Sequence, residues 1–220
     1  MGKFTVIGMG NFGYHVTKCL FNEGHEVLAI DSDRNLIQSI SPLCSQAIEM
    51  DATDKEALET LGLENMDGVL VCVGNSLSNS ILISLHLNEI GVKRIIVKAL
   101  DDDHAKILRK IGVTDVIHPE REMAARLAKS LSHPNIIDFI PISEDFEVLQ
   151  LTPPDDFQGK TLRDLNLRSK YGIQVIAVKH GDSGKNELIP EASYIVNSKD
   201  SLVILGENKN IKKIRSLNKK

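Results

Sequence analysis

The stretch GMGNFG at residues 8–13 decides the fold, because it is a G-x-G-x-x-G motif that follows the apolar run Phe4–Ile7 and opens a segment of helical periodicity. Gly8 permits a tight turn, Gly10 leaves the backbone open to a pyrophosphate, and Gly13 lets the helix approach the strand closely. Phosphates then bind to the free amides at the helix N-terminus. Asp31 ends the next predicted strand, at the spacing where an acid accepts hydrogen bonds from ribose hydroxyls.

Outward from this motif, short β-branched runs alternate with helical segments as far as about residue 119. The predicted strands are Phe4–Ile7, Val27–Ile30, Ala47–Met50, Val69–Val73, Ile95–Lys98 and Val116–Ile117. The predicted helices are Asn11–Glu23, Asp33–Ile40, Asp54–Leu61, Ser76–Ile90, Asp101–Ile111 and Arg121–Leu131. Most of the strands are apolar throughout, as expected of strands buried on both faces. The pattern predicts an α/β fold with a doubly wound parallel sheet, the Rossmann class.

The regular alternation stops at the segment SHPN, residues 132–135. We therefore expect a nucleotide-binding domain of residues 1–136 and a small α+β domain of residues 137–220. The second segment contains strand-like runs and one predicted helix, Leu162–Lys170. Its predicted strands are Phe139–Ile142, Phe146–Leu151, Gln174–Lys179, Glu187–Ile189, Tyr194–Val196 and Leu202–Leu205. So small a domain is marginally stable alone, which favours packing on another subunit.

Composition excludes several classes of protein. The net charge of -4 argues against a nucleic-acid binder, and the basic tail Lys209–Lys220 has apolar residues at helical spacing, as in a solvated helix that packs one edge. No apolar run approaches the length that crosses a bilayer, and the N-terminus has no signal peptide, so we expect a cytoplasmic protein without membrane insertion. Cys19, Cys44 and Cys72 are too widely separated for a disulfide framework or zinc site and are expected in the core.

Further polar groups follow the other strands, and each has two interpretations. Asp51 borders the adenine pocket or caps a helix. Gly74 follows the fourth strand at the topological switch point, where its backbone faces the ligand. Lys98 neutralises phosphate charge or extends its ammonium group into solvent. Asp31 disfavours a ribose 2′-phosphate, although Arg34 lies nearby, so NAD or an adenosine phosphate is expected before NADP.

The candidate nucleotide-binding residues all lie in loops that follow predicted strands, or at the ends of those strands. They are Gly8, Met9, Gly10, Asn11, Phe12, Asp31, Ser32, Asp33, Arg34, Asp51, Ala52, Thr53, Val73, Gly74, Asn75 and Lys98.

The chain resembles the RCK (regulator of K+ conductance) proteins, especially the cytosolic nucleotide-binding subunits of the TrkA and KtrA type in bacterial potassium uptake systems. The resemblance rests on the segments VIGMGNFG (6–13), GHEVLAID (24–31), IHPE (117–120) and LNLRSKYG (165–172). It implies an RCK N-terminal domain followed by a TrkA-C-like domain, which regulate rather than catalyse. It also implies homodimers that assemble into an octameric ring under a membrane-embedded potassium-translocating subunit. In such proteins ATP or NADH is associated with activation, and ADP or NAD with the inactive state.

The resemblance assigns nucleotide contacts to six of the candidate residues: Gly8, Gly10, Asp31, Asp33, Asp51 and Lys98. It makes Glu120 a candidate ligand for Mg2+ or Ca2+ near a subunit interface. One glutamate is too few oxygen ligands for either ion, and Glu120 is equally interpreted as an acid in the first turn of a helix. Asn11 departs from the arginine that the Ktr pattern often has at this position. Its neutral amide lacks a charge-assisted contact to a γ-phosphate, which favours AMP, ADP or NAD(H).

Ktr relatives also bind cyclic di-AMP between two C-terminal domains. The matching positions here are Leu165, Arg168, Gln174, His180 and Pro190. Arg168 suits a phosphate, and Gln174 and His180 offer hydrogen bonds. Each also has an ordinary interpretation, Arg168 as a charge at a helix C-terminus and Pro190 as an edge-strand residue.

The competing function is an NAD-dependent oxidoreductase, because dehydrogenases share this fold and motif. Such an enzyme requires a positioned acid or base beside the nicotinamide. His104, His118 and His133 are the candidates, yet none has an evident orienting partner in the sequence, and each is interpreted as a surface or capping histidine. We therefore expect a protein that is not an enzyme.

Overall fold

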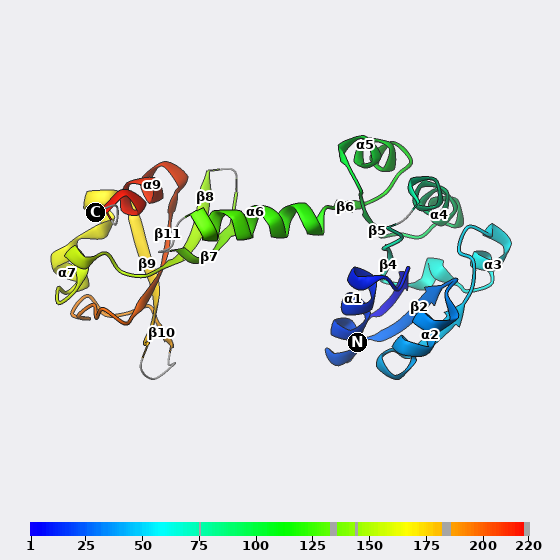
Figure 1. The fold of residues 1–220 in the computed structure, drawn as a ribbon, viewed down its shortest axis with the longest axis horizontal. Coiled ribbons are helices and arrows are strands. Elements are labelled where there is room, and N and C mark those ends of the chain that lie inside the picture. Colours follow the sequence, from blue (N-terminus) through cyan, green and yellow to red (C-terminus); the bar gives the residue numbers. More distant parts are fainter. Residues whose placement is uncertain (75, 133–135, 144, 182–185, 218–220) are drawn as a thin grey trace. The chain divides into compact units, whose positions relative to one another are not determined.

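A computed structural model of the chain describes residues 1–74, 76–132, 136–143, 145–181 and 186–217 (Figure 1). The chain divides into two compact units, Met1–Pro119 and Glu120–Lys220, and each has its own sheet. The division thus falls after Pro119, whereas the sequence predicted a boundary after residue 136. The helix α6 (Pro119–Ser132) lies between these two positions.

The N-terminal unit is a six-stranded parallel sheet in the order β3-β2-β1-β4-β5-β6. Its strands are β1 (Lys3–Ile7), β2 (Glu26–Asp31), β3 (Gln46–Glu49), β4 (Gly68–Val71), β5 (Ile95–Lys98) and β6 (Asp115–Ile117). Its helices are α1 (Asn11–Asn22), α2 (Arg34–Ile40), η1 (Ser41–Leu43), α3 (Lys55–Glu59), η2 (Leu63–Asn65), α4 (Leu77–Ile90) and α5 (Asp102–Lys110). The predicted doubly wound fold is confirmed, and β1 and β4 flank its switch point.

Neighbouring residues of a strand point to opposite faces of the sheet. In this sheet both faces are buried, each in its own hydrophobic cluster. Val6 joins a cluster with Ile37 and Ile40 of α2, whereas Ile7 joins a second cluster with Leu87 of α4 and Leu108 of α5. Full burial of such a side chain stabilises the fold by about 1.5–3 kcal/mol. The two clusters therefore fix the sheet between helical layers and hold its carboxyl edge in place.

Helix ends follow the expected local rules. The carboxylates of Asp33, Asp54 and Asp101 accept hydrogen bonds from the first turns of α2, α3 and α5. Gly62 and Gly91 adopt positive φ just beyond helices α3 and α4, a conformation that costs glycine little.

The second unit holds an antiparallel sheet in the order β10-β9-β11-β8-β7. Its strands are β7 (Ile136–Pro141), β8 (Phe146–Leu151), β9 (Ile173–Lys179), β10 (Asn186–Leu188) and β11 (Ser201–Glu207). Besides α6 its helices are η3 (Asp155–Phe157), α7 (Leu162–Leu165), α8 (Leu167–Tyr171) and α9 (Asn208–Leu217). Ile211 and Ile214 of α9 are buried in a core with Leu149 and Leu202, which confirms the predicted apolar edge of this helix.

Three expectations need correction. The helix predicted over Leu162–Lys170 is divided at Asn166, whose φ of 45° is left-handed and interrupts the helix. The segment 194–196 forms only an isolated bridge between Ile195 and Thr161. Cys19 is exposed on α1, because it lies on the opposite side of the helix from the buried Gly13 and Thr17.

The other two cysteines, Cys44 and Cys72, are buried as expected, and burial raises the pKa of the Cys44 thiol. No helix in the described part of the chain combines the length and apolar character that crossing a membrane requires.

Candidate functional site

The glycine-rich loop joins β1 to α1, and its three glycines have different structural roles. Gly8 has a φ of 96°, and a Cβ there would lie 2.9 Å from the main-chain nitrogen of Val73. A Cβ on Gly13 would overlap the carbonyl oxygen of Gly8. By contrast, no atom lies within 4 Å of the Cβ position of Gly10, which is exposed. Packing therefore requires the first and third glycines, whereas the second leaves open space above the loop.

The N-terminus of α1 faces this open space. Gly10 is its N-cap residue and supplies no side-chain hydrogen bond, and the first turn contains no acidic residue. The amide of Tyr14 donates to the carbonyl oxygen of Gly10 at 2.9 Å, which begins the intrahelical hydrogen bonds. The amides before Tyr14 have no intrahelical acceptor, and with the helix dipole they suit an anion such as phosphate.

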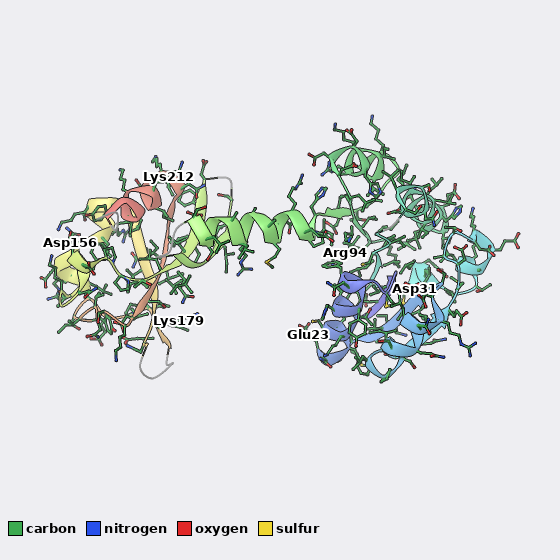
Figure 2. The ribbon with its side chains drawn as sticks, in the orientation of Figure 1. Glu23, Asp31, Arg94, Asp156, Lys179 and Lys212 are labelled. Atoms are coloured by element: carbon green, nitrogen blue, oxygen red, sulfur yellow. The ribbon has the colours of Figure 1, made fainter. Side chains whose placement is uncertain are left out.

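Asp31 lies at the end of β2, adjacent to the loop (Figure 2). Its Oδ2 accepts the amide hydrogen of Met9 at 2.5 Å, and its Oδ1 accepts that of Asp33 at 2.8 Å. A carboxylate oxygen can accept more than one hydrogen bond, so the half-buried Asp31 retains acceptor capacity for ribose hydroxyls. The acid expected to bind the sugar is thus also bonded to the phosphate loop.

Asp51 follows β3, next to Asp31 along the same edge. Its carboxylate accepts the amide hydrogen of Thr53 at 2.9 Å and the hydroxyl hydrogen of Thr53 at 2.8 Å, and these bonds hold the pKa of Asp51 below its usual value. The cap of α3 is Asp54, which bonds the amide of Ala57 at 3.3 Å. Asp51 is therefore an exposed, ionised acid at the site edge, while the side chain of Ala52 is buried in the core.

At the switch point, the amide of Cys72 donates to the carbonyl oxygen of Ile7 at 2.7 Å, which ties the end of β4 to β1. A Cβ on Gly74 would lie 3.4 Å from the Nζ atom of Lys98. The ammonium group of Lys98 thus lies over the backbone that follows β4. Asn75, the third residue predicted in this loop, lies outside the described residues.

The remaining predicted nucleotide residues lie at the same edge with distinct environments. Met9 is 1% exposed, so its side chain belongs to the core, while its amide is bonded to Asp31. Asp33 is engaged as the cap of α2, where its carboxylate accepts the amide hydrogen of Asn35 at 2.7 Å. Asn11, Ser32 and Arg34 are exposed, and Phe12, Thr53 and Val73 are half-buried.

His104 and His118, each expected as a surface or capping histidine, are buried. His104 is fully buried and accepts the amide hydrogen of Leu100 at its Nδ1, 3.2 Å away. Burial lowers the pKa of His104, which keeps its imidazole neutral. His118 is 8% exposed, and within the described chain the Nε2 atoms of both histidines lack a hydrogen-bond partner. His133 lies outside the described residues.

Glu120 lies in the first turn of α6, as the helix interpretation expected. The described residues contain no cluster of three or more His, Cys, Asp or Glu side chains that suits a metal ion. Among the residues that the structure describes, Glu120 is therefore not part of such a cluster.

The second unit contains a cavity of about 300 Å3 beside α7, α8 and β9. Its lining residues are Leu162, Arg163, Asn166, Leu167, Arg168, Ile173, Gln174, Val175, Pro190 and Ala192. Arg168, Gln174 and Pro190 of the predicted dinucleotide set lie there. Leu165 is 6% exposed and belongs to the core. His180 lies outside this lining, with its Nε2 3.4 Å from Glu187 and its Nδ1 3.6 Å from Asp200.

Comparison with known domain families assigns both units. Residues 4–119 match the TrkA-N domain, and residues 147–219 match the TrkA-C domain. The fold and its glycine loop thus define a class, a Rossmann-type TrkA-N domain joined to a TrkA-C domain.

Two relatives from Bacillus subtilis (strain 168) match nearly end to end. Ktr system potassium uptake protein C is 39% identical over 205 residues, which is 93% of this chain and 91% of that protein. Ktr system potassium uptake protein A is 36% identical over 214 residues, 97% of this chain and 96% of that protein. The chain belongs to the family of Ktr and Trk potassium uptake proteins, which confirms the resemblance inferred from its motifs.

A solved structure has the same fold. The GsuK RCK domain superposes with a TM-score of 0.68 at 16% identity, over 100% of this chain and 48% of that chain. The GsuK channel bound to NAD gives the same TM-score over 40% of its length. This chain thus spans less than half of either structure, and at this identity the likeness concerns the fold.

Proposed function

We propose that this protein is the nucleotide-sensing regulatory subunit of a potassium uptake system. It binds an adenine nucleotide in the TrkA-N domain and controls a membrane-embedded potassium-translocating subunit from the cytoplasmic face. Control requires that the nucleotide bind one conformation of the assembly more tightly than another, because a ligand with equal affinity for both shifts no population.

One arrangement carries the proposal, the open space above Gly10 at a helix N-terminus with an acid beside it. The amides of α1 would bind the phosphates, the carboxylate of Asp31 the ribose, and the ammonium group of Lys98 would balance phosphate charge. The names of the Ktr relatives support the link to potassium uptake.

The nucleotide is proposed to be AMP, ADP or NAD(H) in preference to ATP. Asn11 is exposed at the start of α1, where a neutral amide adds no charge to a terminal phosphate. The negative charge of Asp31 disfavours a ribose 2′-phosphate, so NAD is preferred over NADP, although the cation of Arg34 lies nearby.

Exposed apolar surface supports assembly into homodimers and a larger ring. Met123, Leu127 and Leu131 recur every four residues along α6 and are 59%, 57% and 74% exposed. Such a stripe on a helix marks a protein contact. Leu82 on α4 is also exposed, by 39%. In this assembly Glu120 would meet Mg2+ or Ca2+ together with ligands from the nucleotide or another subunit.

The cavity in the second unit is proposed as a site for cyclic di-AMP. Arg168 would pair with a phosphate, Gln174 would hydrogen-bond a base, and Pro190 would pack against one. His180, which the sequence placed among these positions, does not line the cavity and is not part of the proposed site.

Calorimetry with purified protein tests the nucleotide site, after removal and identification of any nucleotide that co-purifies. ATP, ADP, AMP, NAD and NADH are titrated into wild type and Gly10→Val. Gly10 has a φ of -60° and open space at its Cβ position, so valine fits the fold but fills the phosphate position. We expect at least one nucleotide to bind wild type and none to bind Gly10→Val. Cys19→Val, an exposed position on α1, is the control and should bind normally.

The oxidoreductase alternative is tested with the same protein. NADH is incubated with a panel of keto acids, and its absorbance is followed. The proposal expects binding without turnover. Steady NADH oxidation above the buffer rate would contradict it.

A further inference from the structure

The positive charge of this chain is concentrated in α9 and the residues that follow it. Residues 208–220 contain six of the 26 Lys and Arg residues and none of the 30 Asp and Glu residues. Since the whole chain has a net charge of -4, residues 1–207 carry -10 once these six charges are subtracted. We call residues 208–220 the basic segment. Its six cations are Lys209, Lys212, Lys213, Arg215, Lys219 and Lys220.

The apolar side of α9 is already occupied within the second unit. Ile211 and Ile214 are 0% and 1% exposed and lie in its hydrophobic core. Lys212, labelled in Figure 2, and Lys213 lie between them in sequence and are exposed. A partner of this surface therefore meets charge rather than an apolar stripe. For the same reason the helix has no spare apolar face with which to enter a bilayer.

Acids of the same unit neutralise only part of this charge. Lys209 forms an ion pair with Glu207 at 2.5 Å, and this bond is the main reason why the pKa of Lys209 is raised. Lys213 donates to the amide oxygen of Asn210 at 3.3 Å, which leaves its charge in place. Among the described residues, Lys212 has no ion-pair partner. Cationic groups of α9 are thus available to an external anion.

The chemistry of the basic segment suits a surface of anionic lipid headgroups. Clusters of about four to eight Lys and Arg on an amphipathic helix are typical of segments that bind anionic phospholipids. The segment contains no aromatic residue on which the bases of a single-stranded nucleic acid would stack. At physiological salt, exposed charges are screened beyond about 8 Å, so the negative charge elsewhere in the chain does not cancel a local contact.

We propose that the basic segment binds the anionic phospholipid headgroups of the membrane surface without insertion. The proposal rests on the proposed function, which places the protein beside a membrane-embedded subunit. The buried Ile211 and Ile214 would keep α9 on its own unit while the exposed ammonium groups meet the lipid. Such a contact would orient the second unit at the membrane, and its repetition over the copies of an assembly would strengthen it.

Cosedimentation of the full-length protein with lipid vesicles tests this, without nucleotide and without the translocating subunit. One set of vesicles contains phosphatidylglycerol and phosphatidylcholine in equal parts, and the other contains phosphatidylcholine alone. We expect binding to the anionic vesicles only, and weaker binding as the salt concentration rises. The triple variant Lys212→Gln/Lys213→Gln/Arg215→Gln should bind about a hundred-fold more weakly, from about five-fold for each cation removed.

Two control variants separate local charge from net charge and from the chemistry of lysine. Lys18→Gln/Lys93→Gln/Lys160→Gln removes the same charge from exposed positions outside the basic segment and should bind like wild type. Lys212→Arg/Lys213→Arg keeps the local charge and should also bind like wild type. Glutamine is a good helix former, so the triple variant in α9 should keep the melting temperature of wild type.

The outcomes separate this proposal from the proposed function. Wild-type affinity of the triple variant in α9, or equal binding to both sets of vesicles, would overturn the lipid contact. Binding to a DNA duplex in place of the vesicles would overturn it as well and assign the segment to nucleic acid. If vesicles are not bound while potassium flux still responds to nucleotide, the lipid contact falls and the proposed function stands. Vesicle binding with flux that ignores nucleotide supports the lipid contact and contradicts the proposed function.

Discussion

The carboxylate of Asp31 accepts the amide hydrogen of Met9 at 2.5 Å, so the acid at the end of β2 holds the loop that follows β1. A second bond, from the amide of Asp33 at the N-cap of α2, fixes the same carboxylate. The group proposed to bind ribose therefore also sets the position of the loop proposed to bind phosphate. In the proposed function, one side chain would therefore link recognition of the sugar to recognition of the phosphate.

Asp31→Ala is expected to weaken nucleotide binding by about 1–3 kcal/mol, the range for hydrogen bonds that involve a charged group. The variant loses the ribose acceptor and releases the amide of Met9. Calorimetry with the nucleotide that binds wild type measures the effect. Asp54→Asn, which alters the cap of α3 on the same edge, is the control. An affinity for Asp31→Ala equal to that of wild type would remove Asp31 from the ribose role.

Gly13→Ala is expected to lower the free energy of unfolding by about 1–3 kcal/mol or more, the cost of overpacking, because its Cβ would overlap the carbonyl oxygen of Gly8. Gly10→Ala should change stability by no more than about 0.5 kcal/mol, as at an uncrowded surface position. Urea unfolding of both variants tests the contrast. Equal stability of the two would show that the loop is not packed as described.

His104 should make stability depend on pH in a defined direction. Burial lowers its pKa in the folded protein, so the unfolded chain binds the proton more readily. The contribution of neutral His104 is therefore present above about pH 6.5, the unperturbed histidine pKa, and is lost as pH falls below it. Unfolding free energies from about pH 8 to 5 should fall more steeply for wild type than for His104→Gln.

The control for His104 is His15→Gln, since His15 is exposed on α1. This variant should follow the wild-type pH profile. Parallel profiles for wild type and His104→Gln would contradict the buried, neutral state of His104.

Tyr194→Phe should destabilise the protein by about 1–3 kcal/mol, because it removes a donor from a buried carboxylate. Asp200 is 5% exposed and accepts the hydroxyl hydrogen of Tyr194 at 2.6 Å. Burial and this bond raise the pKa of Tyr194 to about 12. Thermal or urea unfolding measures the loss, and Tyr14→Phe, on α1, is the control expected to be neutral. An equally small effect of both substitutions would contradict the account.

Much of the N-terminal unit could be predicted from the sequence, because its strands are continuously apolar and its helices carry local end signals. The glycine loop and Asp31 were found from spacing alone, since the turn, the helix and the acid each demand particular residue types. The bond from Met9 to Asp31 was not foreseen, because a main-chain donor leaves no mark in the sequence.

The second unit was harder to predict, because its short helices depend on tertiary contacts. The break at Asn166 follows from one left-handed residue inside an otherwise helical pattern. Arg163 belongs to no sequence motif, and only the structure shows that it lines the same cavity as Arg168. The burial of His104 was likewise missed, because a histidine that follows three aspartates has the pattern of a solvated helix start.

Potassium flux tests the central claim most directly. Vesicles that contain the membrane-embedded potassium-translocating subunit are combined with this protein, and flux is recorded as the bound nucleotide is exchanged. We predict that flux changes with the nucleotide for wild type and Cys19→Val and is insensitive to it for Gly10→Val. Flux that does not respond to any nucleotide with wild type, or that responds equally with Gly10→Val, would contradict the account.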